Sequence, residues 1–171
     1  MIASQAAHAS EARTGATAST QEVLSFRLGS EEYGIDILKV QEIRSYEPPT
    51  RIAHAPAHMR GVINLRGVIV PVVDLRQRFG APSAVIDGFT VVIVLHLGAR
   101  TVGIVVDSVS DVLQLASDQI RSAPQVSCAI DAAYITGLGS IAERTLILLD
   151  IQALLNSPEM GLVDVALPGV H

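Results

Sequence analysis

Histidines and a single cysteine are the residues of this chain that could bind a metal ion or act as nucleophiles. His54 and His58 are four residues apart, the spacing of two metal ligands on one helix face. Pro56 lies between them and disfavours that helix, so we favour surface-loop histidines and predict no metal site. Cys128 cannot form an internal disulfide, and Arg121 is its only evident basic neighbour in sequence, so a reactive thiolate is not expected.

Phosphate and acid–base chemistry have equally little support. Residues 137–140 (GLGS) resemble a fragment of a phosphate-binding loop but lack its later glycine and Lys-Ser/Thr pair, so we expect a tight turn there. No serine lies in a Gly-x-Ser-x-Gly elbow. Five aspartates could supply paired carboxylates: Asp36, Asp74, Asp107, Asp111 and Asp150. Two of these, Asp74 and Asp150, sit at equivalent points of two repeated segments, 70–75 and 146–151, which favours helix caps. We therefore predict no catalytic residue and no cofactor.

The composition restricts the class of protein. The chain has 171 residues, a net charge of −5, 49% hydrophobic residues and no tryptophan. An acidic chain with few aromatic residues is not expected to bind nucleic acid. No apolar run approaches the roughly 20 residues of a membrane helix, and residues 1–20 lack the apolar core of a signal peptide. We expect a soluble cytoplasmic protein without direct membrane insertion, with disordered tails at residues 1–20 and 161–171.

The elements of the chain are organised around residues 61–75 (GVINLRGVIVPVVDL). This stretch predicts two short strands joined by a turn at residues 64–67, because Asn and Gly tolerate left-handed backbone. Pro71 cannot donate a ladder hydrogen bond, so we expect its strand at a sheet edge or a bend. Asp74 is placed to cap a helix over residues 75–79.

Arg66 is a lone cation within this apolar stretch. Either it is the solvated tip of the turn, or an acidic partner holds it in a groove. Ile37, Val40 and Glu42 likewise place apolar groups beside a carboxylate near a strand end. They form either an ordinary barrel wall with a solvated acid or one side of a binding groove.

The chain contains an internal repeat. Segments 23–29, 34–37 and 40–43 are matched 69 residues later by 92–98, 103–106 and 109–112, and segment 70–75 is matched by 146–151. Several matches in the same order indicate two copies of one strand-rich unit of about 65 residues. Units of that size are marginal alone, so we expect two small barrels packed together with a groove between them. We place the first barrel at about 22–88, completed by the C-terminal helix region, and the second at about 89–155.

Residues 22–163 resemble the CheW family of bacterial chemotaxis coupling proteins. The resemblance rests on residues 32–44 (EYGIDILKVQEIR) and 64–71 (NLRGVIVP), and continues through 102–107 (VGIVVD) and 134–139 (YITGLG). It implies a mainly β protein with two five-stranded Src-homology-3-like barrels, related by duplication, and a CheW-like domain over residues 21–160.

The resemblance also implies an adaptor without enzymatic activity. Members of this family join the cytoplasmic hairpin tip of a chemoreceptor to the regulatory domain of the histidine kinase CheA. They are monomers in isolation, assemble into receptor–kinase arrays, and reach the inner face of the membrane through the receptors.

Residues are carried over by their position in the matching motifs. The receptor-facing set, to which the groove argument adds Ile37, is Ile37, Val40, Glu42, Arg66, Val92 and Val112. The kinase-facing set is Gly103, Gly137, Arg121 and Val126. For the two glycines, kinase contact and barrel packing are both open.

Two other functions stay under consideration. An adaptor of a sibling chemosensory pathway, such as one governing surface motility, would have the same fold and different partners. A small β-barrel enzyme or ligand-binding domain would instead require a concave pocket with convergent polar groups.

Overall fold

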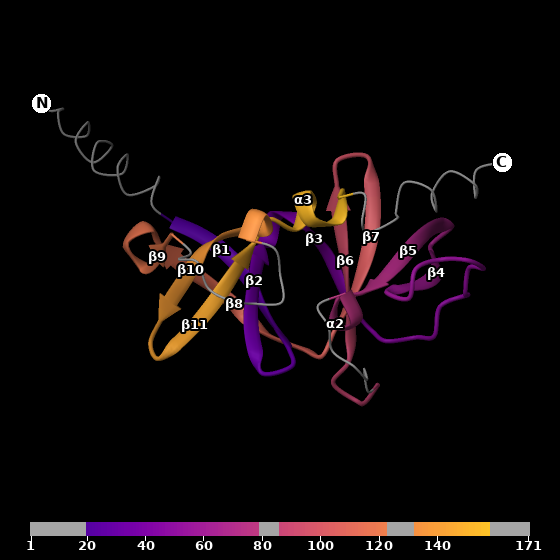
Figure 1. Ribbon diagram of the computed structural model, residues 1–171, viewed down its shortest axis with the longest axis horizontal. Coiled ribbons are helices and arrows are strands. Elements are labelled where there is room, and N and C mark those ends of the chain that lie inside the picture. Colours follow the sequence, from indigo (N-terminus) through magenta and orange to yellow (C-terminus); the bar gives the residue numbers. More distant parts are fainter. Residues whose placement is uncertain (1–19, 79–85, 123–131, 158–171) are drawn as a thin grey trace, which may run out of the picture.

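The computed structural model describes residues 20–78, 86–122 and 132–157. Eleven strands and a few short helices make up this part of the chain (Figure 1). In chain order they are β1 (Thr20–Leu28), β2 (Glu31–Asp36), the 3₁₀ helix η1 (Ile37–Lys39), β3 (Val40–Ser45), β4 (Met59–Leu65), β5 (Val68–Asp74), α2 (Leu75–Arg78), β6 (Val91–Leu97), β7 (Arg100–Val106), β8 (Ser108–Ala116), η2 (Ser117–Gln119), β9 (Ile120–Arg121), η3 (Ala132–Tyr134), β10 (Ile135–Ile141), β11 (Arg144–Leu149) and α3 (Ile151–Leu155). Apart from Thr20, which begins β1, the predicted tails lie outside the described residues.

The strands form two sheets with one shared topology. The five-stranded sheet has the order β3-β6-β7-β5-β4, and the six-stranded sheet has the order β8-β1-β2-β11-β10-β9. With β6, β7, β8, β10 and β11 as the repeats of β1 to β5, the order is the same in both sheets, and β9 is an addition. This agreement supports the internal duplication.

The predicted bounds of the two barrels are nevertheless wrong, because each sheet takes strands from both copies. The hairpin β1–β2 belongs to the six-stranded sheet, while β3, β4 and β5 of the same copy belong to the five-stranded sheet (Figure 1). Chain reach explains this exchange. To pair antiparallel with β1 of its own hairpin, β3 would have to begin beside the start of β2. The chain would then have to return about 20 Å, the length of β2, before β3 begins. Only η1 (Ile37–Lys39) joins the two strands, and it reaches about 14 Å.

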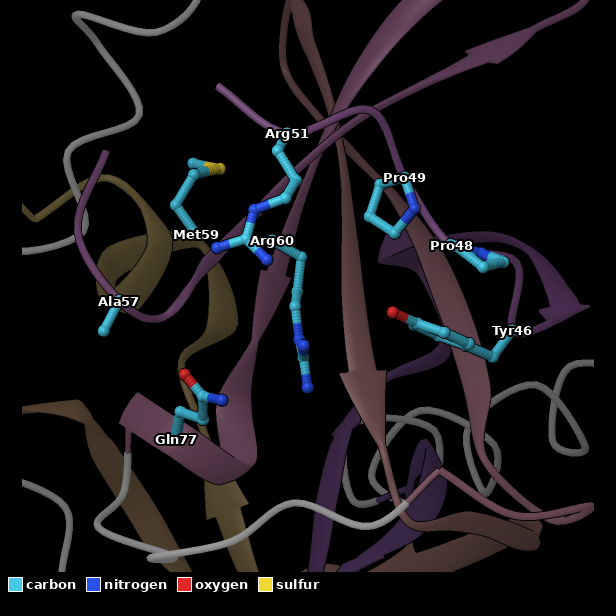
Figure 2. Close-up of a pocket in the computed structure, with 8 residues that line it drawn as sticks. All are labelled: Tyr46, Pro48, Pro49, Arg51, Ala57, Met59, Arg60 and Gln77. Carbon is cyan, nitrogen blue, oxygen red and sulfur yellow. The ribbon is translucent and has the colours of Figure 1, made fainter. Parts of the chain in front are cut away.

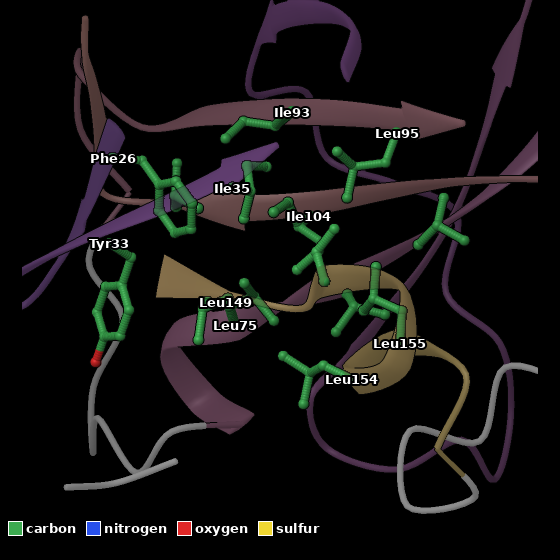
Figure 3. Packing of buried hydrophobic residues seen from close by; sticks show 14 of the residues in the cluster. Phe26, Tyr33, Ile35, Leu75, Ile93, Leu95, Ile104, Leu149, Leu154 and Leu155 are labelled. Carbon is green, nitrogen blue, oxygen red and sulfur yellow. The ribbon is translucent and has the colours of Figure 1, made fainter. Parts of the chain in front are cut away.

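The two sheets share one apolar core. It is built mainly from aliphatic side chains, since the chain has no tryptophan. This shared core consists of Leu24, Phe26, Leu28, Tyr33, Ile35, Met59, Val73, Leu75, Ile93, Leu95, Leu97, Val102, Ile104, Val106, Leu149, Ile151, Leu154 and Leu155 (Figure 3). Strand β6 turns Ile93 and Leu95 to the shared core and Val92 and Val94 to a smaller cluster inside its own barrel. Burial of both faces accounts for its continuous apolar run from Val91 to Leu95.

The predicted turn at residues 64–67 is confirmed. Arg66 and Gly67 have φ values of 52° and 90°, and the side-chain oxygen of Asn64 accepts a 2.8 Å hydrogen bond from the Gly67 amide. Two successive positive φ values are those of a type I′ hairpin turn. The edge position expected for Pro71 is wrong, because β5 lies between β4 and β7. The ladder with β7 begins only at Val72, so Pro71 lies beyond its end.

The expected turn at residues 137–140 is also wrong, because these residues lie within β10 (Ile135–Ile141). Both glycines are buried where neighbouring groups come close. A Cβ atom on Gly139 would lie 2.8 Å from a Leu115 methyl carbon, and one on Gly137 would lie 2.9 Å from the Arg121 carbonyl oxygen. The glycines therefore serve close packing within a strand.

Both predicted helix caps are confirmed. The Asp74 carboxylate accepts a 3.0 Å hydrogen bond from the Arg76 amide, and the Asp150 carboxylate accepts one of 3.1 Å from Ala153. The capped helices are α2 and α3, and Phe79, the predicted end of the first, lies outside the described residues. No helix in the described ranges has the length and apolar content needed to cross a membrane.

Candidate functional site

Glu42 and Arg66, predicted separately from the sequence, form an ion pair. Arg66 Nη2 lies 2.5 Å from Glu42 Oε1, and Arg44 Nη1 lies 3.4 Å from Glu42 Oε2. The hydrogen bond from Arg66 lowers the pKa of Glu42 below its ordinary value. The Arg66 side chain is still 64% exposed. Arg66 is therefore a solvated turn tip, as the first alternative has it. Glu42 is its acidic partner, but the exposed pair does not hold Arg66 in a groove.

Two apolar residues precede Glu42 in the chain, Val40 at the start of β3 and Ile37 in η1. Both are partly buried against the shared core, and we call them the apolar ledge. Ile37 also lines a cavity of about 380 Å³ between η1 and strands β1 and β8, whose rim includes Leu38, 85% exposed. The predicted groove side thus combines half-exposed apolar groups with one ion pair.

Val92 does not belong to this surface. Its side chain is 3% exposed and packs inside the five-stranded barrel with Val72, Val94 and Val105. The expected contact of Val92 with a partner is therefore corrected to a packing role. Its neighbour Val91 is instead partly buried against the shared core, and it pairs with Ser45 at the end of the β3–β6 ladder away from Val40. The two valines point to opposite faces of β6, because side chains alternate along a strand. The sequence of β6 is apolar on both faces apart from one histidine, so it does not show which valine points into the barrel.

Val112 lies on a different sheet from the ion pair. It belongs to β8, at the edge of the six-stranded sheet, where it pairs with Leu24 of β1 and is 51% exposed. The receptor-facing prediction therefore divides into two places: Glu42, Arg66 and the ledge on one side, and Val112 on the other copy's edge strand.

Two members of the kinase-facing set are neighbours. Arg121 is exposed on β9, and its carbonyl oxygen lies against Gly137 of β10. Gly103 is remote in the topology, on β7 of the five-stranded sheet, where an added Cβ atom would lie 2.9 Å from a Val92 methyl carbon. That contact gives Gly103 a packing role. Val126 lies outside the described residues.

A second ion network occupies the corresponding place in the other barrel. Arg144 binds Glu32 and, through Nη2 at 3.0 Å, Asp111, which is the repeat counterpart of Glu42. Ser25 donates a 2.8 Å hydrogen bond to Asp111. The hydrogen bonds from Arg144 lower the pKa values of both carboxyl groups. Sequence reasoning missed this network, because its members are up to 119 residues apart.

A third network is buried. Arg76, 2% exposed, donates to both oxygens of the fully buried Asp74 at 3.0 Å and to Asp107 at 3.2 Å. Arg60 Nη2 lies 2.9 Å from Asp74 Oδ2, which also accepts a hydrogen bond from Arg76. Burial acts to raise the pKa of Asp74, but the hydrogen bonds from Arg76 and Arg60 prevail and lower it. These aspartates are thus committed to arginines rather than to one another.

The geometry gives no support to metal chemistry in the described ranges. Residues 51–58 do not form the helix that the spacing of His54 and His58 would require. No group of three or more His, Cys, Asp or Glu side chains there is arranged to hold a metal ion.

Comparison with known proteins decides the family. The model of the CheW-like domain matches residues 22–159, which is most of the chain. The chain belongs to the CheW family. A chemotaxis protein CheW of Klebsiella aerogenes is 60% identical over 144 residues, covering 84% of this chain and 87% of that relative. A probable chemotaxis protein CheW of Rhizobium etli is 36% identical over 139 residues, covering 81% and 90%.

A solved structure agrees. The crystal structure of the scaffolding protein TtCheW from Thermoanaerobacter tengcongensis matches this CheW-family chain with a TM-score of 0.73 and 30% identity. The match covers 80% of this chain and 93% of that one. The predicted fold class is confirmed: a mainly β protein of two Src-homology-3-like barrels with short helices.

Proposed function

We propose that this CheW-family protein is a non-enzymatic adaptor that couples chemoreceptors to the histidine kinase CheA and helps to build receptor–kinase arrays. The observation that carries the proposal is the exposed Glu42–Arg66 ion pair, with the apolar ledge of Ile37 and Val40 preceding Glu42 in the chain. The names of the relatives, which are chemotaxis proteins and a scaffolding protein, support this class of function.

The ledge suits the cytoplasmic hairpin tip of a receptor, which is helical. An amphipathic helix laid on such a surface buries its apolar side chains there. Charges at the rim set orientation more than affinity, which is the role we give to Glu42 and Arg66. Val112, exposed on β8, is a second contact for the same hairpin from the other barrel.

The kinase surface is β9 with the adjoining part of β10. Arg121 is exposed there, and Gly137 allows β9 to approach closely enough to present it. Val126, which lies outside the described residues, stays a proposed contact of the CheA regulatory domain on the family resemblance alone. In this proposal the protein is a cytoplasmic monomer that receptors recruit to the inner face of the membrane.

The test is ATP turnover by CheA with receptor-containing membranes, with and without this protein. We expect the protein to raise turnover and an attractant to suppress the increase. Glu42→Lys should abolish the increase while the fold is kept. Glu143→Lys is the matched control, because it makes the same charge change at an exposed turn residue of the other sheet. No response with cognate partners, or equal loss in both variants, would contradict the proposal.

A further inference from the structure

The segment between β3 and β4 is held rigidly against the sheet edge. Thr50 and Val62 exchange two backbone hydrogen bonds of 2.8 Å each. Gly61 makes this approach possible, since it has a φ of 140° and any Cβ atom there would lie 2.0 Å from the Thr50 carbonyl oxygen. The Met59 amide also donates to the Pro56 carbonyl oxygen at 2.9 Å. The segment therefore has a fixed shape before any partner arrives.

Beneath this segment is a cavity of about 420 Å³ into which cationic side chains converge. Figure 2 shows Arg51 and Arg60 reaching into one space, with the hydroxyl end of Tyr46 on the opposite wall and Gln77 below. Its lining residues include neither aspartate nor glutamate. In a protein of net charge −5, such a pocket is a local concentration of hydrogen-bond donors.

The two arginines differ in how they are held. Arg60 Nε and Nη2 both bind Asp74 from behind, at 3.0 and 2.9 Å, which fixes the guanidinium and leaves Nη1 without a partner among the described residues. Asp74 is fully buried, and its carboxylate forms ion pairs with Arg60 and Arg76. Arg51 is exposed and has no ion pair within the part of the chain that the structure describes. One guanidinium is thus preorganised and the other is uncompensated.

We propose that this pocket binds a carboxylate side chain presented by an acidic segment of a partner protein. Guanidinium groups match carboxylate oxygens in geometry and charge, and Tyr46 adds a hydroxyl donor. Pro48, Pro49 and Met59 supply apolar wall for the methylene groups of a glutamate. The rim residues Pro48 and Arg51 are exposed, so a carboxylate attached to a chain can enter from solvent. The site is separate from Glu42 and Arg66 and does not rest on the proposed coupling function.

The test is a titration of the full-length ¹⁵N-labelled protein, followed by amide chemical shifts. The probe is the blocked peptide Gly-Leu-Glu-Glu-Leu-Gly, and its matched control has both glutamates replaced by glutamine. We expect saturable shifts confined to residues 46–62 and to Gln77, which also lines the pocket, with the glutamate peptide only. Arg51→Ala should weaken binding about tenfold. Arg27→Ala, which removes an exposed arginine from the other sheet, should leave binding unchanged.

Three results would overturn the proposal. Equal weakening by Arg51→Ala and Arg27→Ala would mean non-specific charge attraction, and shifts confined to residues other than 46–62 and Gln77 would mean another site. Free glutarate binding as tightly as the peptide, with the same dependence on Arg51, would make this a site for small carboxylates rather than for a protein segment. Tyr46→Phe guards against misfolding as an explanation, because it should weaken binding while retaining the ring that packs on the barrel core.

Discussion

Glu42 and Arg66 make a pair whose charges face solvent, so the pair is better suited to recognition than to stability. Arg66 also has left-handed backbone, which the Asn64 side chain stabilises through its bond to the Gly67 amide. A partner would therefore meet a guanidinium and a carboxylate held at fixed positions by the turn and the edge strand.

Reversing the pair separates these roles. We expect the double variant Glu42→Arg with Arg66→Glu to keep the wild-type melting temperature, because the ion pair is restored with opposite polarity. It should still fail to bind receptor, since orientation depends on the sign of each charge. Co-sedimentation with receptor-containing membranes, beside each single variant, measures this. Full receptor binding by the double variant would show that the pair acts only through the fold.

Arg76 has the opposite character, because it stabilises a buried acid. We expect Arg76→Ala to lower the free energy of unfolding by about 3–5 kcal/mol at pH 7, since it leaves the Asp74 carboxylate buried with Arg60 as its remaining arginine. Urea unfolding followed by circular dichroism gives the value.

The pH dependence identifies the cause. In the wild type the pKa of Asp74 lies below its ordinary 3.8, so its stabilising contribution is present above pH 3.8 and disappears as the pH falls through the lowered value. Without Arg76 we expect burial, which acts to raise that pKa, to outweigh Arg60, so that protonation relieves the buried charge. The difference between wild type and Arg76→Ala should therefore shrink from pH 7 towards pH 3.5. A constant difference, or the same trend after adding Asp74→Asn, would exclude Asp74 as the origin.

For single residues, the sequence predicts local roles such as helix caps better than it predicts which distant side chains come into contact. The two caps and the importance of Arg66 followed from residue type and spacing. The networks around Arg144 and Arg76 did not, because they join residues distant in sequence. Which of Val91 and Val92 faces the interior of the barrel depends on the phase of strand alternation. Residues 90–93 (TVVI) contain no charged side chain that would mark the solvent side, so the sequence does not tell the two faces apart.

Among the elements, the position of β9 depends on a single glycine of the neighbouring strand, Gly137. Strand β9 has two residues and pairs with β10 at Leu138 and Gly139. A Cβ atom at Gly137 would lie 2.9 Å from backbone of β9, whereas at Gly139 it would lie 2.8 Å from the end of the Leu115 side chain, which can rotate. The two glycines thus offer the same substitution with different consequences.

We expect Gly137→Ala to displace β9 and to weaken binding of the CheA regulatory domain. Gly139→Ala should disturb the barrel core but leave β9 and kinase binding in place. Amide hydrogen exchange at Ile120 and Arg121 reports the strand, and calorimetric titration reports the kinase. Kinase binding lost with unchanged exchange would assign Gly137 to the contact itself, and equal effects from both variants would point to general barrel damage.

Most strands and both short helices were predictable from turns, caps and apolar runs. The errors at Pro71 and at residues 137–140 have one cause. Glycine and proline indicate where a ladder is interrupted or a neighbour comes close, and interior strands contain such places as well as edges and turns. Only the neighbouring strands, β7 beside Val72 and β9 beside Gly137, distinguish the cases.

For the whole molecule, the repeat predicted two copies but not the exchange of their hairpins. The same apolar matches would arise whether β1–β2 completed its own barrel or the other one. The deciding quantity is the length of the link after each hairpin: η1 after β2, and Asp107 alone between β7 and β8. Both links are too short to lead the chain back along a strand.

This exchange makes the two halves interdependent, which can be tested by dividing the chain at residue 88. Fragment 1–88 would hold β1–β2 without a sheet to join and β3–β5 without the hairpin that completes it. We expect no folded monomer from either fragment 1–88 or fragment 89–171, and recovery of the β spectrum with a cooperative melt when the two are mixed. Circular dichroism and sedimentation velocity follow both. A homodimer of one fragment would fit, because two copies can exchange hairpins as the repeats do. A cooperatively melting monomer of fragment 1–88 would instead show that one copy can close its own barrel.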